Sequence, residues 1–119
     1  MRSLGIFIIV LLFVFVAHPR AHAEVEVQVE SINTVSIERN SEGNTSFEVQ
    51  VTARNLSLED AEARITVQAL DKNGKELKTV KLRGSVWGMS AQTLAKKVSM
   101  PTDDFDSIVK WEVARFRAW

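Results

Sequence analysis

The fold is decided by the stretch from Thr45 to Arg54, which reads TSFEVQVTAR. Apolar residues occupy every second position from Phe47 to Ala53, and polar or charged residues lie between them. This period of two is typical of a strand with one face in a core and the other in solvent. The stretch from Ala63 to Ala69 repeats the pattern, with Ile65 and Val67 on its inward face. The two stretches predict antiparallel sheet structure with one buried face.

Similar stretches and turn signals lie on both sides of this segment. Residues 24–30 alternate through valines, and the phase slips at residues 31–33, which predicts a bulge or bend before Val35 and Ile37 resume the pattern. Residues 40–44 form a predicted turn of residue types that tolerate positive φ. Residues 71–74, Asp-Lys-Asn-Gly, predict a hairpin turn with the glycine in the left-handed position.

Further strands are expected over residues 75–82, over residues 92–100 and around Trp111, with an irregular stretch at 84–90 and a break at 101–104. No segment shows a convincing helical period. Short strands at this spacing, joined by turns, favour an antiparallel sandwich. We therefore predict an all-β protein, an immunoglobulin-like antiparallel β-sandwich of six to seven strands.

The first 23 residues have the three parts of a secretory signal peptide in the right order. A basic start at Arg2 precedes an apolar run over residues 4–17, and Ala21 and Ala23 supply the small residues of a cleavage site. The apolar run is shorter than the roughly 20 residues that a membrane span needs. We expect cleavage after Ala23, a single domain over residues 24–119, and a periplasmic or secreted protein.

Residue types exclude several functions of the expected mature chain. Cleavage removes His18 and His22, and the sequence contains no Cys and no Tyr. Ser-His-Asp triads, cysteine nucleophiles and most zinc or copper sites are thereby excluded. Lys and Arg total 15 and Asp and Glu total 15, so no positive excess draws in nucleic acid. We expect no enzyme, no cofactor, no nucleic-acid partner and no membrane span after cleavage.

Three polar patterns resemble known functional motifs, namely a catalytic motif, a Ca²⁺ site and glycosylation sites. The residues Ser107 and Lys110 match the S-x-x-K pattern of one hydrolase class, but the further motifs of that class are absent. Carboxylates over residues 103–106 suit Ca²⁺ by chemistry, and their spacing favours a solvated loop instead. Asn44 and Asn55 each begin a glycosylation sequon, and Asn55 is predicted to be a turn residue.

A family resemblance rests on two segments. Residues 51–57 read VTARNLS, and residues 65–74 read ITVQALDKNG. With the alternating pattern over residues 47–119, they resemble the FxLYD-type, immunoglobulin-like domains of bacterial exported proteins. In that family a strand ends in an Asn-rich turn, and the next closes on Leu-Tyr-Asp before a Gly turn. Here residues 69–71 read Ala-Leu-Asp without the tyrosine, and Trp-Gly-Met-Ser at residues 87–90 replaces a Pro-Gly-Glu turn. The resemblance implies an accessory or interaction module without catalytic residues.

The tryptophans are the strongest candidates for a functional role. Trp111 alternates with Val109 and Val113, so we predict it in the core. Trp87 stands beside Met89 in an irregular stretch. Its surroundings favour a cap over one end of the sandwich, with an exposed contact for a partner or a sugar as the alternative.

The carboxyl-terminal residues alternate basic and aromatic side chains up to Trp119, which anchors the last strand or presents a sheet edge to a partner. The candidate contact residues are therefore Trp87, Met89, Phe116 and Trp119. We expect the partner to be another envelope or secreted protein, and self-association through an edge strand is a further option. The alternative function is a small-ligand or carbohydrate-binding domain that uses exposed aromatic residues.

Overall fold

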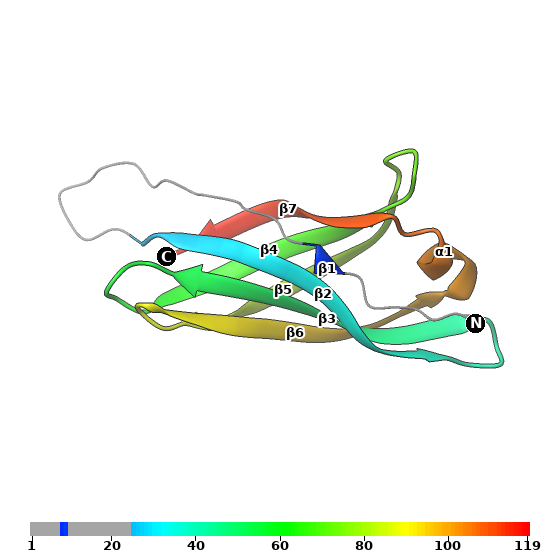
Figure 1. The fold of residues 1–119 in the computed structure, drawn as a ribbon, viewed down its shortest axis with the longest axis horizontal. Helices are drawn as coiled ribbons and strands as arrows, with labels where there is room; N and C mark the ends of the chain where they lie inside the picture. The colour runs from blue at the N-terminus through cyan, green and yellow to red at the C-terminus, as the bar shows by residue number, and fades with distance from the viewer. Residues whose placement is uncertain (1–7, 10–24) are drawn as a thin grey trace.

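The computed structural model describes residues 8–9 and 25–119, which form two antiparallel sheets packed face to face (Figure 1). The first sheet has the order β1 (Ile8–Ile9), β2 (Val27–Arg39), β3 (Asn44–Asn55), β6 (Ser90–Pro101). The second has the order β5 (Glu76–Val86), β4 (Ala61–Leu70), β7 (Lys110–Ala118). The predicted all-β architecture with two antiparallel sheets is confirmed.

The predicted signal peptide, residues 1–23, lies outside the described residues apart from Ile8 and Ile9. These two form β1 and pair antiparallel with Asn33 and Ile32 of β2. Within residues 8–9 and 25–119, no helix is long and apolar enough to cross a membrane.

The core lies between the sheets and follows the alternation of the sequence. Every second residue of β3 and β4 is buried, including Phe47, Val51, Ile65 and Val67 as predicted. Trp111 of β7 is 2% exposed, which confirms its predicted place in the core. The other buried members of the same cluster are Val27, Val29, Ile32, Val49, Ala53, Ala61, Ala63, Ala69, Val80, Leu82, Val86, Leu94, Met100 and Ile108.

The predicted bulge in β2 is confirmed by a register shift between Val29 and Ser31. After the shift, Ile32 and Thr34 face the core, whereas the sequence pattern placed Val35 inward. A second irregularity follows between Val35 and Glu38, where Ser36 adopts φ 56°. At each irregularity β2 has one residue more than the paired stretch of β3. The second irregularity places the Ile37 side chain against the core again.

The break predicted at residues 101–104 is instead the start of a helix, α1 (Thr102–Asp106). Pro101 precedes it with φ −57°, and Asp103 and Asp104 lie in its first turn, where carboxylates favour a helix amino terminus. A helix this short is less than two turns, so it shows no 3.6-residue period in the sequence.

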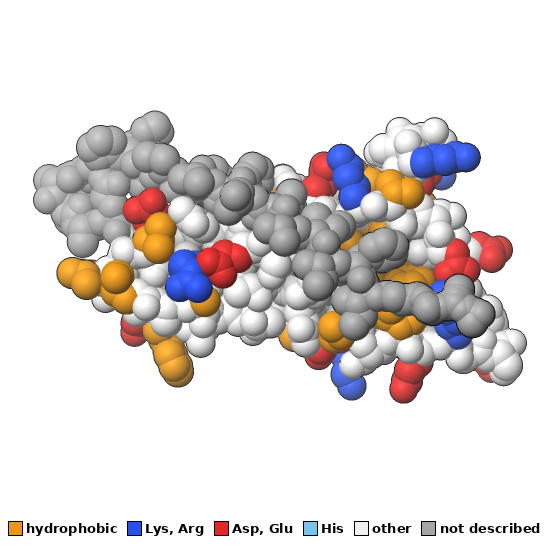
Figure 2. Space-filling view, viewed as in Figure 1, with side chains coloured by type: hydrophobic (Ala, Val, Ile, Leu, Met, Phe, Trp, Pro, Cys, Tyr) orange, Lys and Arg blue, Asp and Glu red, His pale blue; other side chains and the backbone are white. Residues whose placement is uncertain are grey.

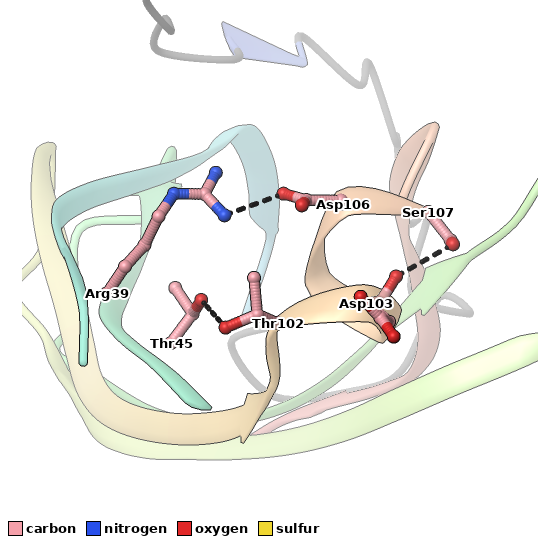
Figure 3. A network of polar contacts seen from close by, with 6 residues as sticks. All are labelled: Arg39, Thr45, Thr102, Asp103, Asp106 and Ser107. Carbon is pink, nitrogen blue, oxygen red and sulfur yellow. Dashed lines mark hydrogen bonds and ion pairs between the residues drawn. The ribbon is translucent and has the colours of Figure 1, made fainter. Parts of the chain in front are cut away.

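Polar and aromatic contacts fix α1 on the end of the sandwich that carries the β2–β3 turn (Figure 3). Arg39 of β2 forms an ion pair with Asp106 at 2.9 Å, and the hydroxyls of Thr45 and Thr102 hydrogen-bond at 2.8 Å. The guanidinium carbon of Arg39 lies over the Phe105 ring, 5.6 Å from its centroid, and this centroid is 4.9 Å from that of Phe47. This end of the sandwich is therefore closed by packed aromatic side chains.

Two strand assignments also differ from the sequence pattern. Strand β5 continues to Val86, so the irregular stretch shrinks to residues 87–89. Gly84 lies within this continuation, where a Cβ would lie 2.5 Å from Cδ2 of the flexible Leu94 side chain on β6. Val109 is 54% exposed, since β7 begins one residue later and Ile108 takes the core position before it.

The β4–β5 turn gives a pH-dependent contribution to stability. The backbone N–H of Lys75 donates to the Asp71 carboxylate at 2.9 Å, and this bond is the main reason that the pKa of Asp71 lies below its ordinary value. The N–H of Asn73 donates to the same oxygen at 2.8 Å. Gly74 adopts φ 81°, the left-handed conformation predicted for it.

Because the folded pKa of Asp71 is lowered, its stabilising contribution is present above the ordinary value of 3.8 and is lost as the pH falls through the folded value. We expect the unfolding free energy of Asp71→Asn to decline less steeply than that of the unaltered protein below this pH. Urea titrations at a series of acidic pH values measure the difference. Parallel declines in the two proteins would contradict the assignment.

Candidate functional site

Four large apolar side chains are exposed together on the connections at one end of the sandwich, which we call the apolar end. The β3–β4 connection supplies Leu56 (40% exposed) and Leu58 (85%), and the β5–β6 connection supplies Trp87 (60%) and Met89 (62%). Figure 2 shows apolar side chains gathered at this end, which lies opposite α1 in Figure 1. Soluble proteins rarely expose apolar side chains in groups, and such groups mark interaction sites.

The side chain of Asn55, at the end of β3, joins the two connections. Its Nδ2 donates to the carbonyl oxygens of Glu59 (2.8 Å) and Val86 (2.9 Å). Its Oδ1 accepts the backbone N–H of Ser57 at 2.9 Å and also the Ser57 hydroxyl. Asn55 is completely buried, so these bonds satisfy a polar group that water does not reach. The prediction of a turn residue is wrong, because Asn55 is the last residue of β3 and only its side chain reaches into the connection that follows.

Backbone contacts lock the connections against each other. The N–H of Met89 donates to the carbonyl oxygen of Ser57 at 2.9 Å, and that of Gly88 donates to Oδ1 of Asp60 at 2.9 Å. Gly88 approaches Leu58 so closely that a Cβ would overlap its carbonyl oxygen and lie 2.6 Å from its carbonyl carbon. The exposed side chains are therefore presented by a fixed backbone.

Aromatic rings are packed together at the α1 end of the sandwich and exposed at the apolar end. At the α1 end, Phe47 packs against Phe105 and lies 6.1 Å from Trp111 between ring centroids. At the apolar end, the Trp87 side chain is 60% exposed. The prediction that Trp87 caps the sandwich is thus wrong, because the asparagine and the close backbone contacts already close this end. The Trp87 ring lies on the surface, which agrees with the exposure that the alternative interpretation of Trp87 requires.

The other candidate contact residues divide between the core and the surface. Met89 lies with Trp87 at the apolar end, while Phe116 is half-buried against the core. Trp119 is 44% exposed, and its backbone exchanges two hydrogen bonds with Glu62 at 2.8 and 3.0 Å. The tail therefore anchors the last strand and still presents an aromatic ring.

Leu56 and Leu58 were missed as site residues by sequence reasoning. Their signal is the run Asn-Leu-Ser-Leu-Glu-Asp over residues 55–60, in which two leucines stand in an otherwise polar connection. Neither leucine continues the alternation of β3. Large apolar residues at loop positions are a pointer to a contact surface.

The polar patterns of the sequence have structural partners. The Ser107 hydroxyl donates to the carbonyl oxygen of Asp103 at 2.9 Å, and Nζ of Lys110 lies 3.5 Å from a carboxylate oxygen of Glu112. No three acidic or other metal-ligating residues converge within the described part of the chain. Asn55, the second sequon asparagine, is engaged on both sides of its amide.

A second surface feature lies towards the α1 end. An open hollow of about 620 Å³ is bordered by Ser36, Glu38, Ser46, Phe47, Glu48, Lys97, Val98 and Ser99. Among the described residues that border it, Phe47 is the aromatic one, and it is 2% exposed. The described border therefore offers no exposed aromatic ring on which a sugar could stack.

No protein-family model matches the sequence, and no curated protein matches it. Among solved structures, a DUF1425 family member from Shewanella sp. pv-4 is 11% identical, with a TM-score of 0.48 over 90% of this chain and 94% of that chain. A conserved hypothetical protein from Bacillus anthracis is 12% identical, with a TM-score of 0.49 over 95% of this chain and 93% of that chain. At these identities no function transfers, and the FxLYD-type resemblance stays a prediction.

Proposed function

We propose that this protein is a non-enzymatic, exported, immunoglobulin-like module that binds another protein through its apolar end. The observation that carries the proposal is the joint exposure of Leu58, Trp87 and Met89 on hydrogen-bonded connections. Trp and Met are enriched at protein interfaces, and Trp is prominent among residues that dominate binding energy. A fixed backbone reduces the entropy lost on binding.

Export and the lack of enzymatic activity are supported by residue types. The order of basic, apolar and small residues over positions 1–23 supports export. The absence of Cys, with both His residues inside that segment, supports binding over catalysis. The partner that this combination fits is another envelope or secreted protein.

The double substitution Leu58→Ser with Trp87→Ser tests the proposal. Both side chains are largely exposed, so the free energy of unfolding should change by less than about 1 kcal/mol. Affinity for the partner, purified after crosslinking in the native envelope, should fall by about tenfold or more. Titration of the purified partner against each variant measures the change.

Val109→Ser supplies the matched control, because Val109 is a 54% exposed apolar residue outside the apolar end. Its affinity should equal that of the unaltered protein. A double variant that binds as tightly as this control would refute the proposed site, as would a protein that retains no partner at all.

Carbohydrate or small-ligand binding is the second candidate, favoured by the 60% exposure of the Trp87 side chain. A ligand that stacks on this ring would shift tryptophan fluorescence, and Trp87→Ala would abolish the shift. Trp111 is buried and should contribute a constant background, whereas Trp119 is 44% exposed, so a shift that persists in Trp87→Ala would be assigned to Trp119. No shift across a broad panel of glycans and apolar ligands would remove this candidate.

A further inference from the structure

The outer face of the β5-β4-β7 sheet carries basic side chains in two neighbouring cross-strand rows. Arg64 of β4 stands opposite Arg83 of β5 on one side and Arg117 of β7 on the other. In the next row, Lys81 and Arg115 stand on either side of Thr66. All the cations are exposed, and we call this surface the basic face: Arg64, Lys81, Arg83, Arg115 and Arg117.

No carboxylate neutralises the basic face among the described residues. The ion pairs found there lie elsewhere, at Arg39–Asp106, Arg54–Glu30 and Lys110–Glu112. In the row beside the arginines, Glu62 accepts a hydrogen bond from the Ser85 hydroxyl at 2.5 Å. Like charges directly opposite one another destabilise a sheet. Because the whole chain has equal numbers of basic and acidic residues, this concentration is local and suits an anionic partner.

Trp119 lies among the same arginines. Its ring centroid is 5.2 Å from the guanidinium carbon of Arg64 and 5.0 Å from that of Arg117. These contacts hold two guanidinium groups beside an aromatic ring that is 44% exposed. Tryptophan with neighbouring cations is a combination that favours the headgroup level of a membrane surface.

The shape of the basic face decides which kind of anion it suits. An open hollow of about 270 Å³ is bordered by Arg64, Ile65, Thr66, Lys81, Leu82 and Arg83. It does not enclose a small molecule as ligand pockets do. A strand of nucleic acid would need several aromatic faces along a groove, and this face offers one ring already in contact with two arginines. Each guanidinium group can bind two oxygens of one phosphate. A flat array of phosphates therefore suits the basic face best.

We propose that the basic face docks onto an anionic phospholipid surface, with phosphate groups on its arginines and Trp119 at headgroup level. Clusters of four to eight basic residues are typical of segments that bind anionic lipid, and the basic face has five. The proposal goes beyond the proposed function and is independent of it, since the basic face and the apolar end share no residue. Attachment by this face leaves the apolar end available to a protein partner.

Vesicle sedimentation of the protein in the processed form isolated from its native envelope tests the proposal. Binding to phosphatidylglycerol-containing vesicles should exceed binding to phosphatidylcholine vesicles by about tenfold or more, and the excess should fall as salt rises. Arg64→Gln with Arg83→Gln should remove most of the excess. Lys72→Gln with Lys97→Gln, which removes two exposed cations outside the basic face, should keep it. Leu58→Ser with Trp87→Ser should also keep it, which separates this result from that of the proposed function.

Three outcomes would overturn the proposal. Equal binding to the two kinds of vesicle would remove the role of lipid charge. Equal losses of vesicle binding in Arg64→Gln with Arg83→Gln and in Lys72→Gln with Lys97→Gln would show that total charge, and not the basic face, determines binding. Tighter binding to a single-stranded oligonucleotide than to anionic vesicles, lost in Arg64→Gln with Arg83→Gln, would reassign the basic face to nucleic acid.

Discussion

Replacing Asn55 with alanine is expected to lower the free energy of unfolding by about 3 kcal/mol. The substitution leaves the carbonyl oxygens of Glu59 and Val86 without the donor that now lies 2.8 and 2.9 Å away. Each buried polar group without a partner costs about 1–3 kcal/mol. Since small domains are stable by only about 5–15 kcal/mol, the loss is large. Urea or thermal unfolding followed by circular dichroism measures it.

Ser57→Ala is the matched control for this effect. It removes the hydroxyl that donates to Asn55 but keeps both bonds from the Asn55 amide, so it should cost less than about 1 kcal/mol. An Asn55→Ala protein as stable as Ser57→Ala would contradict the organising role of Asn55. Partner binding should also weaken in Asn55→Ala, because the connections that carry Leu58 and Trp87 lose their common anchor.

Replacing Gly88 with alanine is the second large expected effect. The new Cβ would overlap the backbone carbonyl of Leu58, and a backbone group cannot turn away as a flexible side chain can. Relief requires the two connections to separate, which breaks the bond from Met89 N–H to the Ser57 carbonyl oxygen. We expect stability to fall by about 1–3 kcal/mol and partner affinity to fall with it. Unfolding titrations and partner titrations on one sample measure both.

Gly74→Ala is the control that separates the expected backbone clash in Gly88→Ala from the general effect of replacing a glycine. A Cβ at Gly74 meets nothing within 4 Å, although φ of 81° disfavours alanine. This variant should lose about 1 kcal/mol and keep full partner affinity, since the turn lies outside the apolar end. Loss of partner affinity in Gly74→Ala as severe as in Gly88→Ala would mean that the contact between the two connections does not matter.

Much of the fold could be predicted because alternation is a local property. Burial of Val49 and Val51 follows from period two alone, and the left-handed turn at Gly74 follows from residue type. The helix α1 could not be predicted in this way. Its first turn is fixed by Pro101, and its place by the contacts of Phe105 and Asp106 with residues far away in the sequence.

The candidate site could be predicted only in part. Trp87 and Met89 stand out by residue type, but whether a loop tryptophan is covered depends on what else closes that end. Here Asn55 and Gly88 close it through hydrogen bonds and a close backbone approach. The basic face was missed because its cations come from three strands. Only the register that places Arg64 between Arg83 and Arg117 brings them together.

Site-specific photocrosslinking tests the central claim most directly. A photoreactive amino acid replaces Trp87 in one protein and Val109 in another, and both are irradiated in the native envelope. The two positions are similarly exposed, at 60% and 54%, but only the first lies at the apolar end. We predict a discrete protein adduct from position 87 and none from position 109. Adducts of equal yield from both positions, or none from position 87, would contradict a protein-binding apolar end.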